Sequence, residues 1–144
     1  SINFRDERSQ NFQKNLTNRR GDMLFEAVTL HRRFPYAVLG GLFFLDAAAQ
    51  DDGTTKRKST FLNTHLRLQL FTGRIDPAGR EEQYEHLFVV LVGEPATTLR
   101  AYAVGEPDKE VPFDDILHRL ISTVAVRNPD FYEYVDGRLT SVRT

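Results

Sequence analysis

An uninterrupted apolar run from Tyr36 to Leu45 separates two segments of helical periodicity. A short apolar run of this kind is typical of a β-strand that is buried on both faces. Such a strand requires a sheet that is covered by helices on both sides. The pair Gly40-Gly41 inside the run indicates that another backbone or side chain packs very close to it. The run is also too short to span a bilayer.

The rest of the chain alternates between helical and strand periodicity. Apolar residues at helical spacing predict helices over Leu16 to Phe34, Ser59 to Phe71 and Phe113 to Val126. Short apolar or alternating runs predict strands over Ser1 to Arg5, Leu87 to Val92, Thr98 to Val104, Phe131 to Val135 and Leu139 to Val142. The last two strands flank Asp136-Gly137, which is a hairpin signal. The order β-α-β-α-β-β-α-β-β predicts an α/β domain with a mixed β-sheet covered by helices on both faces.

The periodicity also predicts which side chains are buried. In the second helix, Leu62, Leu66 and Leu70 form one apolar stripe, with Phe61 and Leu68 beside it. We expect one continuous core that contains residues from all three helices and from the central strands: Leu24, Ala27, Leu42, Phe44, Leu66, Val89, Leu91, Leu117, Leu120 and Val124.

Length and composition bound the class of protein. The 144 residues, 40% of them hydrophobic and 27% charged, predict a single globular domain, residues 1–144. Because there is no cysteine, disulfides and thiolate metal sites are excluded. With no membrane-spanning run and no recognisable leader, we expect a soluble, cytoplasmic protein. The chain begins directly on a strand pattern, so we also expect it to be the C-terminal part of a longer protein.

The charged residues are unevenly distributed, although the net charge is only −1. Up to Arg74 there are 12 Lys and Arg against 7 Asp and Glu, and after it there are 7 against 13. This asymmetry indicates one basic and one acidic region, unless the two interleave in the fold and cancel.

Two basic clusters lie at the starts of the first two predicted helices. The first contains Lys14, Asn15, Asn18, Arg19 and Arg20, and the second contains Lys56, Arg57 and Lys58. Cations and amides at a helix N-terminus are suited to bind phosphate, so both clusters are candidates for contacts to double-stranded DNA. The alternative interpretation is a solvated surface.

Acidic residues supply candidate metal ligands. Asp22 and Glu26 lie four positions apart on the first helix, where a cation between them would offset their repulsion. A second acidic set is Asp76, Glu81, Glu82 and Glu85, of which Glu85 enters a buried strand. Ordinary surface charge is the alternative for both sets. No two of the four histidines have helical metal-ligand spacing, and we expect His31 and His65 to be core histidines.

Over about residues 1 to 93 the chain resembles restriction-endonuclease-like nucleases of the PD-(D/E)xK superfamily. The similar elements are Ile2-Asn3-Phe4-Arg5, Gln10 to Arg20, Glu26-Ala27, Pro35, Val38 to Leu45 and Thr72-Gly73-Arg74. The resemblance implies a hydrolase that cuts double-stranded DNA with Mg²⁺, of the type II restriction kind. It adds Arg74, after the second helix, to the expected DNA contacts, and it makes Arg5 and Glu26 the candidate catalytic residues, with Glu26 and Asp22 as metal ligands. A homodimer is a further expectation.

The resemblance breaks down at the catalytic motif. Where the family has acidic-x-Lys, this chain has Asn3-Phe4-Arg5. The carbonyl of Asn3 is a poorer Mg²⁺ ligand than a carboxylate, and Arg5 can stabilise phosphate charge but cannot act as a base. Three alternatives follow: the missing ligands lie elsewhere in a longer protein, Glu26 replaces them, or the domain does not cut. In the last case it is a DNA-binding or protein-interaction module.

Overall fold

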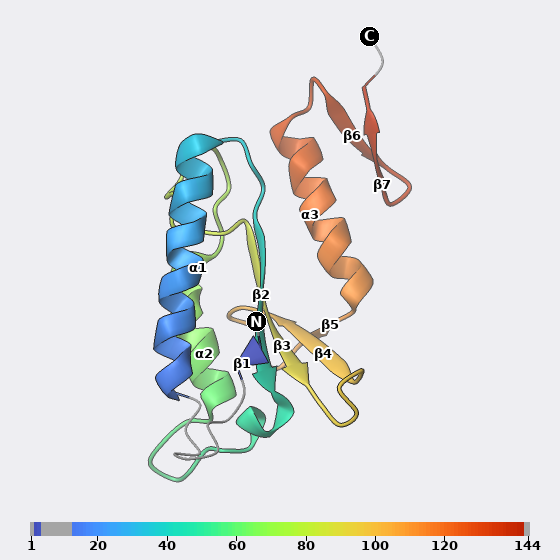
Figure 1. Cartoon of the computed structure of the whole chain (residues 1–144). Helices are drawn as coiled ribbons and strands as arrows, with labels where there is room; N and C mark the ends of the chain where they lie inside the picture. The colour runs from blue at the N-terminus through green and yellow to red at the C-terminus, as the bar shows by residue number, and fades with distance from the viewer. Residues whose placement is uncertain (1, 4–12, 143–144) are drawn as a thin grey trace.

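A mixed β-sheet forms the centre of the molecule (Figure 1). The computed structural model describes residues 2–3 and 13–142, and of residues 2–3 and 13–18 it describes the backbone alone. The strand order is β1 (Ile2–Asn3), β2 (Gly40–Asp46), β3 (His86–Val92), β4 (Leu99–Ala103) and β5 (Glu110–Val111). Strands β1, β2 and β3 are parallel, whereas β4 and β5 are antiparallel to their neighbours. The predicted α/β class and mixed sheet are confirmed.

Three helices of the described part of the chain cover this sheet. Helices α1 (Gln13–Arg33) and α2 (Thr60–Leu68) lie on one side of it, and α3 (Phe113–Arg127) lies on the other (Figure 1). Short 3₁₀ turns follow β2 at Ala47–Gln50 and extend α2 at Gln69–Phe71. The chain then ends in a hairpin, β6 (Tyr132–Val135) and β7 (Arg138–Ser141), which packs against α3. Among the described residues, no helix has the length and apolar character needed to cross a membrane.

The core consists of two clusters, one on each face of the sheet. Because side chains alternate along a strand, Val89 and Leu91 of β3 face one cluster while Phe88 and Val90 face the other. The first cluster also contains Ala27 and residues of α2, and the second contains Ile116 of α3. The expectation of one continuous core is therefore wrong, because the sheet itself separates the two sides.

Several residues assigned to the core from the sequence are exposed. The stripe of Leu62 and Leu66 in α2 and Leu70 in the following 3₁₀ turn faces outward, and the buried face of α2 is instead Phe61, Thr64, His65 and Leu68. Leu42 and Leu117 are exposed as well. The predicted strand over Tyr36 to Leu45 begins only at Gly40, and its residues alternate between buried and open instead of being buried on both faces.

The two glycines in β2 lie where close packing was predicted. A Cβ atom on Gly40 would lie 2.7 Å from Cδ2 of Leu120, and one on Gly41 would lie 2.5 Å from Cδ1 of Leu87. Neither position has room for a side chain unless a neighbour moves. These contacts let α3 and β3 approach β2 closely, so this part of the prediction is confirmed.

Candidate functional site

The N-termini of α1 and α2 lie at the same end of the molecule, where β2 and β3 also end (Figure 1). This arrangement follows from the topology, because α1 is the helix that follows β1 along the chain and α2 is the helix that follows β2, and the two strands are parallel. In open α/β sheets, ligands bind outside the carboxyl ends of the strands. We call this region the basic end, defined by Arg19 and Arg20 of α1 and by Lys56, Arg57 and Lys58 of the loop before α2.

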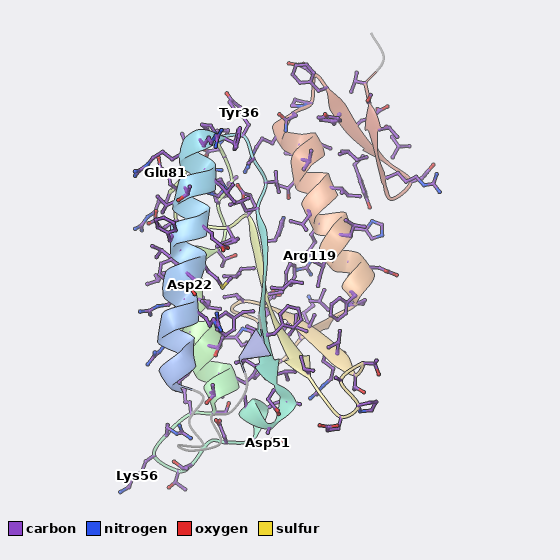
Figure 2. All side chains as sticks on the ribbon, in the orientation of Figure 1. Asp22, Tyr36, Asp51, Lys56, Glu81 and Arg119 are labelled. Carbon is purple, nitrogen blue, oxygen red and sulfur yellow. The ribbon has the colours of Figure 1, made fainter. Side chains whose placement is uncertain are left out.

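The loop of the basic end is fixed to α2 by Asp52. Its carboxylate accepts hydrogen bonds from the backbone N–H of Thr60 (2.6 Å) and from the Thr60 hydroxyl (2.5 Å). Its carbonyl accepts a bond from Nη2 of Arg57 (2.7 Å), and the Ser59 hydroxyl caps the helix. Lys56, Arg57 and Lys58 are exposed, and Lys56 projects from the molecule (Figure 2). A tethered loop of this kind presents its cations in a restricted region next to a helix N-terminus.

Only part of the first predicted basic cluster can be placed. Arg19 is exposed and lies 3.8 Å from the carboxylate of Asp22, while Arg20 is half-exposed. The backbone of Lys14, Asn15 and Asn18 is helical, but their side chains lie outside the description, and Arg5 lies outside the described residues altogether.

Asp22 and Glu26 line one cavity of about 360 Å³ between α1 and β2, together with Arg19 and Tyr84. The Tyr84 hydroxyl donates to the carbonyl of Met23 at 2.8 Å. Burial, and then the negative charge of Glu26, raise the pKa of Tyr84 to about 12. Within the described ranges, no group of three or more His, Asp or Glu could hold a metal ion. Two carboxylates nevertheless suit Mg²⁺, which usually completes its octahedron with water and substrate phosphate.

The most strongly charged buried site surrounds Glu85, at the start of β3. Its Oε1 accepts hydrogen bonds from Nη1 of Arg127 (2.7 Å) and Nη1 of Arg74 (2.8 Å), and Nε2 of His31 lies 3.1 Å away. Its Oε2 accepts the backbone N–H of Leu39 at 2.7 Å. We call Glu85, Arg74, Arg127 and His31 the buried ion cluster. It joins α1, α3 and the loops before β2 and β3.

Hydrogen bonding decides the ionisation of Glu85. Burial on its own raises the pKa of this carboxyl, but the bonds from Arg127, Leu39 and Arg74 and the charge of His31 together hold it below its ordinary value. Glu85 therefore stays charged, and its oxygens are taken up by protein donors. Glu85 is therefore not available as a metal ligand. The second acidic set was expected to supply candidate metal ligands, and for Glu85 this expectation is wrong.

The predicted DNA contact from Arg74 is corrected by the structure. Its side chain is only 1% exposed, and its guanidinium also donates to the carbonyls of Pro35 and Pro77, both at 2.9 Å. A side chain enclosed in this way cannot reach a phosphate on the surface. Arg74 instead holds the loop after α2 against the turn between α1 and β2.

His31 and His65 are both buried, as expected from their positions in the helices. His31 is buried, and its Nδ1 donates to the carbonyl of Glu81 at 2.8 Å. His65 is buried, and its Nδ1 accepts the backbone N–H of Gly105 at 3.1 Å. Burial lowers the pKa of His65 to about 4, with a smaller opposing effect from Asp108. Both are core histidines, as predicted.

No family model, curated protein or solved structure matches this chain.

The sequence analysis missed most of the buried ion cluster. Its one signal was Glu85, a carboxylate next to a long apolar run, since a buried acid requires cationic partners. The partners His31 and Arg127 are 54 and 42 positions away along the chain. No local pattern relates residues at such separations.

Proposed function

We propose that this protein binds double-stranded DNA at its basic end. The observation that carries the proposal is that α1 and α2 begin at the same end of the molecule, with Arg19 and Arg20 in the first part of α1 and Lys56 to Lys58 in the loop before α2 (Figure 1). The partial positive charge of a helix N-terminus adds to the lysines and arginines and favours phosphate. Phosphate contacts of this kind give affinity and orientation without reading the base sequence.

The test is the salt dependence of binding to a DNA duplex. Log affinity should fall steeply with log salt concentration, and the double variant Arg19→Ala/Arg20→Ala should flatten that slope by about two units, since each lost phosphate contact removes about 0.9. Arg32→Ala/Arg33→Ala is the matched control, because it removes the same charge from the opposite end of α1. Equal effects of the two variants, or no binding at low salt, would contradict the proposal.

As a second candidate function, we propose Mg²⁺-dependent cleavage of the bound DNA. Asp22 and Glu26 share one cavity with Arg19, and that arrangement favours this candidate over a purely structural use of the two acids. The parallel β1-α1-β2-α2-β3 arrangement with antiparallel β4 supports our assignment of the fold to the restriction-endonuclease-like type. Asp22 and Glu26 would hold Mg²⁺, which stabilises charge on the reacting phosphate when it is bound. Arg5 is proposed to lie beside the same phosphate.

Nicking of supercoiled DNA tests this second candidate. With Mg²⁺ or Mn²⁺ present, the chain should convert supercoiled to open circular DNA, and Glu26→Gln should abolish nicking while leaving affinity for DNA unchanged. Glu81→Gln is the control, because its carboxylate is engaged with Arg32 at the far end of α1. If the chain binds DNA and never nicks it, the cleavage proposal is wrong and the binding proposal stands.

A further inference from the structure

The buried ion cluster contains more positive than negative charge. The side chains of Arg74 and Arg127 are 1% and 3% exposed, and both donate to the single carboxylate of Glu85. Their other acceptors among the described residues are neutral backbone carbonyls: those of Pro35 and Pro77 for Arg74, and those of Ala37 and Ile75 for Arg127. Two buried guanidinium groups thus share one anion, which leaves a cation uncompensated away from water.

Both arginines also retain unused hydrogen-bond donors. A guanidinium carries five N–H donors, and each of these two groups makes three hydrogen bonds to described residues. The Nε atoms of Arg74 and Arg127 are buried and have no partner in the part of the chain that the structure describes. A buried donor without an acceptor costs free energy, so the two unpaired Nε donors need an explanation.

A cavity adjoins these two side chains. It has a volume of about 260 Å³ and is lined by Arg74, Glu85 and Arg127, by His86, Ser122 and Thr123, and by Gly73, Ile75 and Val126. It lies between α3 and the start of β3, near the end of the molecule opposite to the basic end (Figure 1). It is therefore separate from the proposed DNA surface.

We propose that this cavity binds a small carboxylate that carries an apolar group. The carboxylate would supply the second negative charge and accept hydrogen bonds from the two guanidinium groups, which pair strongly with carboxylates. The apolar group is indicated by the rim, where Ile75 is 84% exposed and Val126 is 78% exposed. Thr123 adds no free donor, because its hydroxyl already donates to the carbonyl of Arg119 and lies 2.7 Å from Nε2 of His86.

The test uses 3-methylbutanoate as the probe, with inorganic phosphate and chloride at the same ionic strength for comparison. Saturable binding by calorimetry and a saturable rise in the unfolding temperature are expected with 3-methylbutanoate, since a ligand that binds only the folded state stabilises it. Chloride should give neither effect. No saturable binding of the carboxylate overturns the proposal, and saturation by phosphate alone overturns the assignment to a carboxylate.

A variant that fills the cavity separates this site from non-specific salt effects. Arg127→Gln could prevent folding, so Ser122→Phe is the better variant, since Ser122 lines the cavity and its side chain makes no hydrogen bond to the described residues. It should abolish the rise in unfolding temperature with 3-methylbutanoate. Thr29→Phe, on an exposed position of α1, is the matched control and should keep the rise. An equal rise in both variants overturns the site.

Discussion

The carboxylate of Glu85 connects separate parts of the fold, because it pairs with His31 of α1, with Arg127 of α3 and with Arg74 of the loop after α2. Its position next to the apolar run of β3 predicts a buried carboxylate, and a buried carboxylate must be paired. The sequence does not indicate which cations pair with it, because His31, Arg74 and Arg127 come from three separate elements. Their convergence is a property of the folded chain.

Removing the charge of Glu85 should destabilise the protein strongly. Glu85→Gln leaves Arg74 and Arg127 buried without an anion, a change that typically costs about 3–5 kcal/mol. Glu82→Gln is the control, because its partner Arg80 is largely exposed and such pairs contribute about 0–1 kcal/mol. Urea unfolding at neutral pH measures both. A similar decrease in the free energy of unfolding in both variants would mean that the buried ion cluster does not stabilise the contact between α1 and α3.

Acid should destabilise the protein through His65. Burial lowers its pKa from 6.5 to about 4 in the folded state, so the unfolded chain binds the proton more readily. The contribution of neutral His65 to the free energy of unfolding is fully present above pH 6.5 and is lost as the pH falls towards 4. His65→Asn keeps an acceptor near the N–H of Gly105 and should show a smaller difference between unfolding free energies at pH 7 and pH 4.5. If the variant and the unchanged protein show the same difference between the two pH values, protonation of His65 is not the cause of the acid destabilisation.

Among the elements, helix α2 shows which features the hydrophobic periodicity of the sequence predicts and which it does not. Its existence was predicted, but the face that it buries was not. The exposed stripe of Leu62, Leu66 and Leu70 is the more apolar one by composition. The buried orientation is set by contacts outside the helix: Thr60 bonds to Asp52, and Phe61 packs edge-on against Tyr102 with ring centroids 5.0 Å apart. Tertiary contacts of this kind are invisible to a hydrophobic pattern.

Two leucines of α2 should therefore respond differently to truncation. Leu68 is 1% exposed, so Leu68→Ala should leave a cavity and cost about 2–5 kcal/mol. Leu66 is 50% exposed, so Leu66→Ala should change the unfolding free energy by about 0.5 kcal/mol or less. Denaturant unfolding of both variants provides the measurement. A larger loss at Leu66 would show that the stripe is covered in solution.

The terminal hairpin was predicted more fully than α2, because its signal is local. Asp136 and Gly137 have φ values of 49° and 77°, the left-handed conformation that a two-residue hairpin turn requires at both positions. Asp and Gly adopt this conformation more readily than other residues do. The local sequence is therefore enough to predict the hairpin. The buried face of α2, in contrast, depends on contacts with residues that are distant in the chain.

At the scale of the whole molecule, the layers follow from one strand. Strand β3 is buried along nearly its whole length, so its alternating side chains supply both core clusters. Its apolar run predicted a central strand, and the structure adds that this strand carries a core cluster on each face. The two cores follow from the same alternation, which the expectation of one continuous core overlooked. The functional residues had weaker signals, because surface cations and acids do not have to follow a period.

This architecture predicts how stability is distributed along the chain. Backbone amides of β3 are hydrogen-bonded between β2 and β4 and lie under both core clusters, so they should exchange with solvent only on global unfolding. The hairpin is exposed along β6 and most of β7 and is held mainly by α3, for example through the bond between the Tyr134 hydroxyl and Nδ1 of His118 (3.0 Å). Its amides should exchange by local opening, orders of magnitude faster than those of β3. Native-state hydrogen exchange at increasing denaturant concentration measures both, and equal protection would show that the hairpin and the sheet unfold as a single unit.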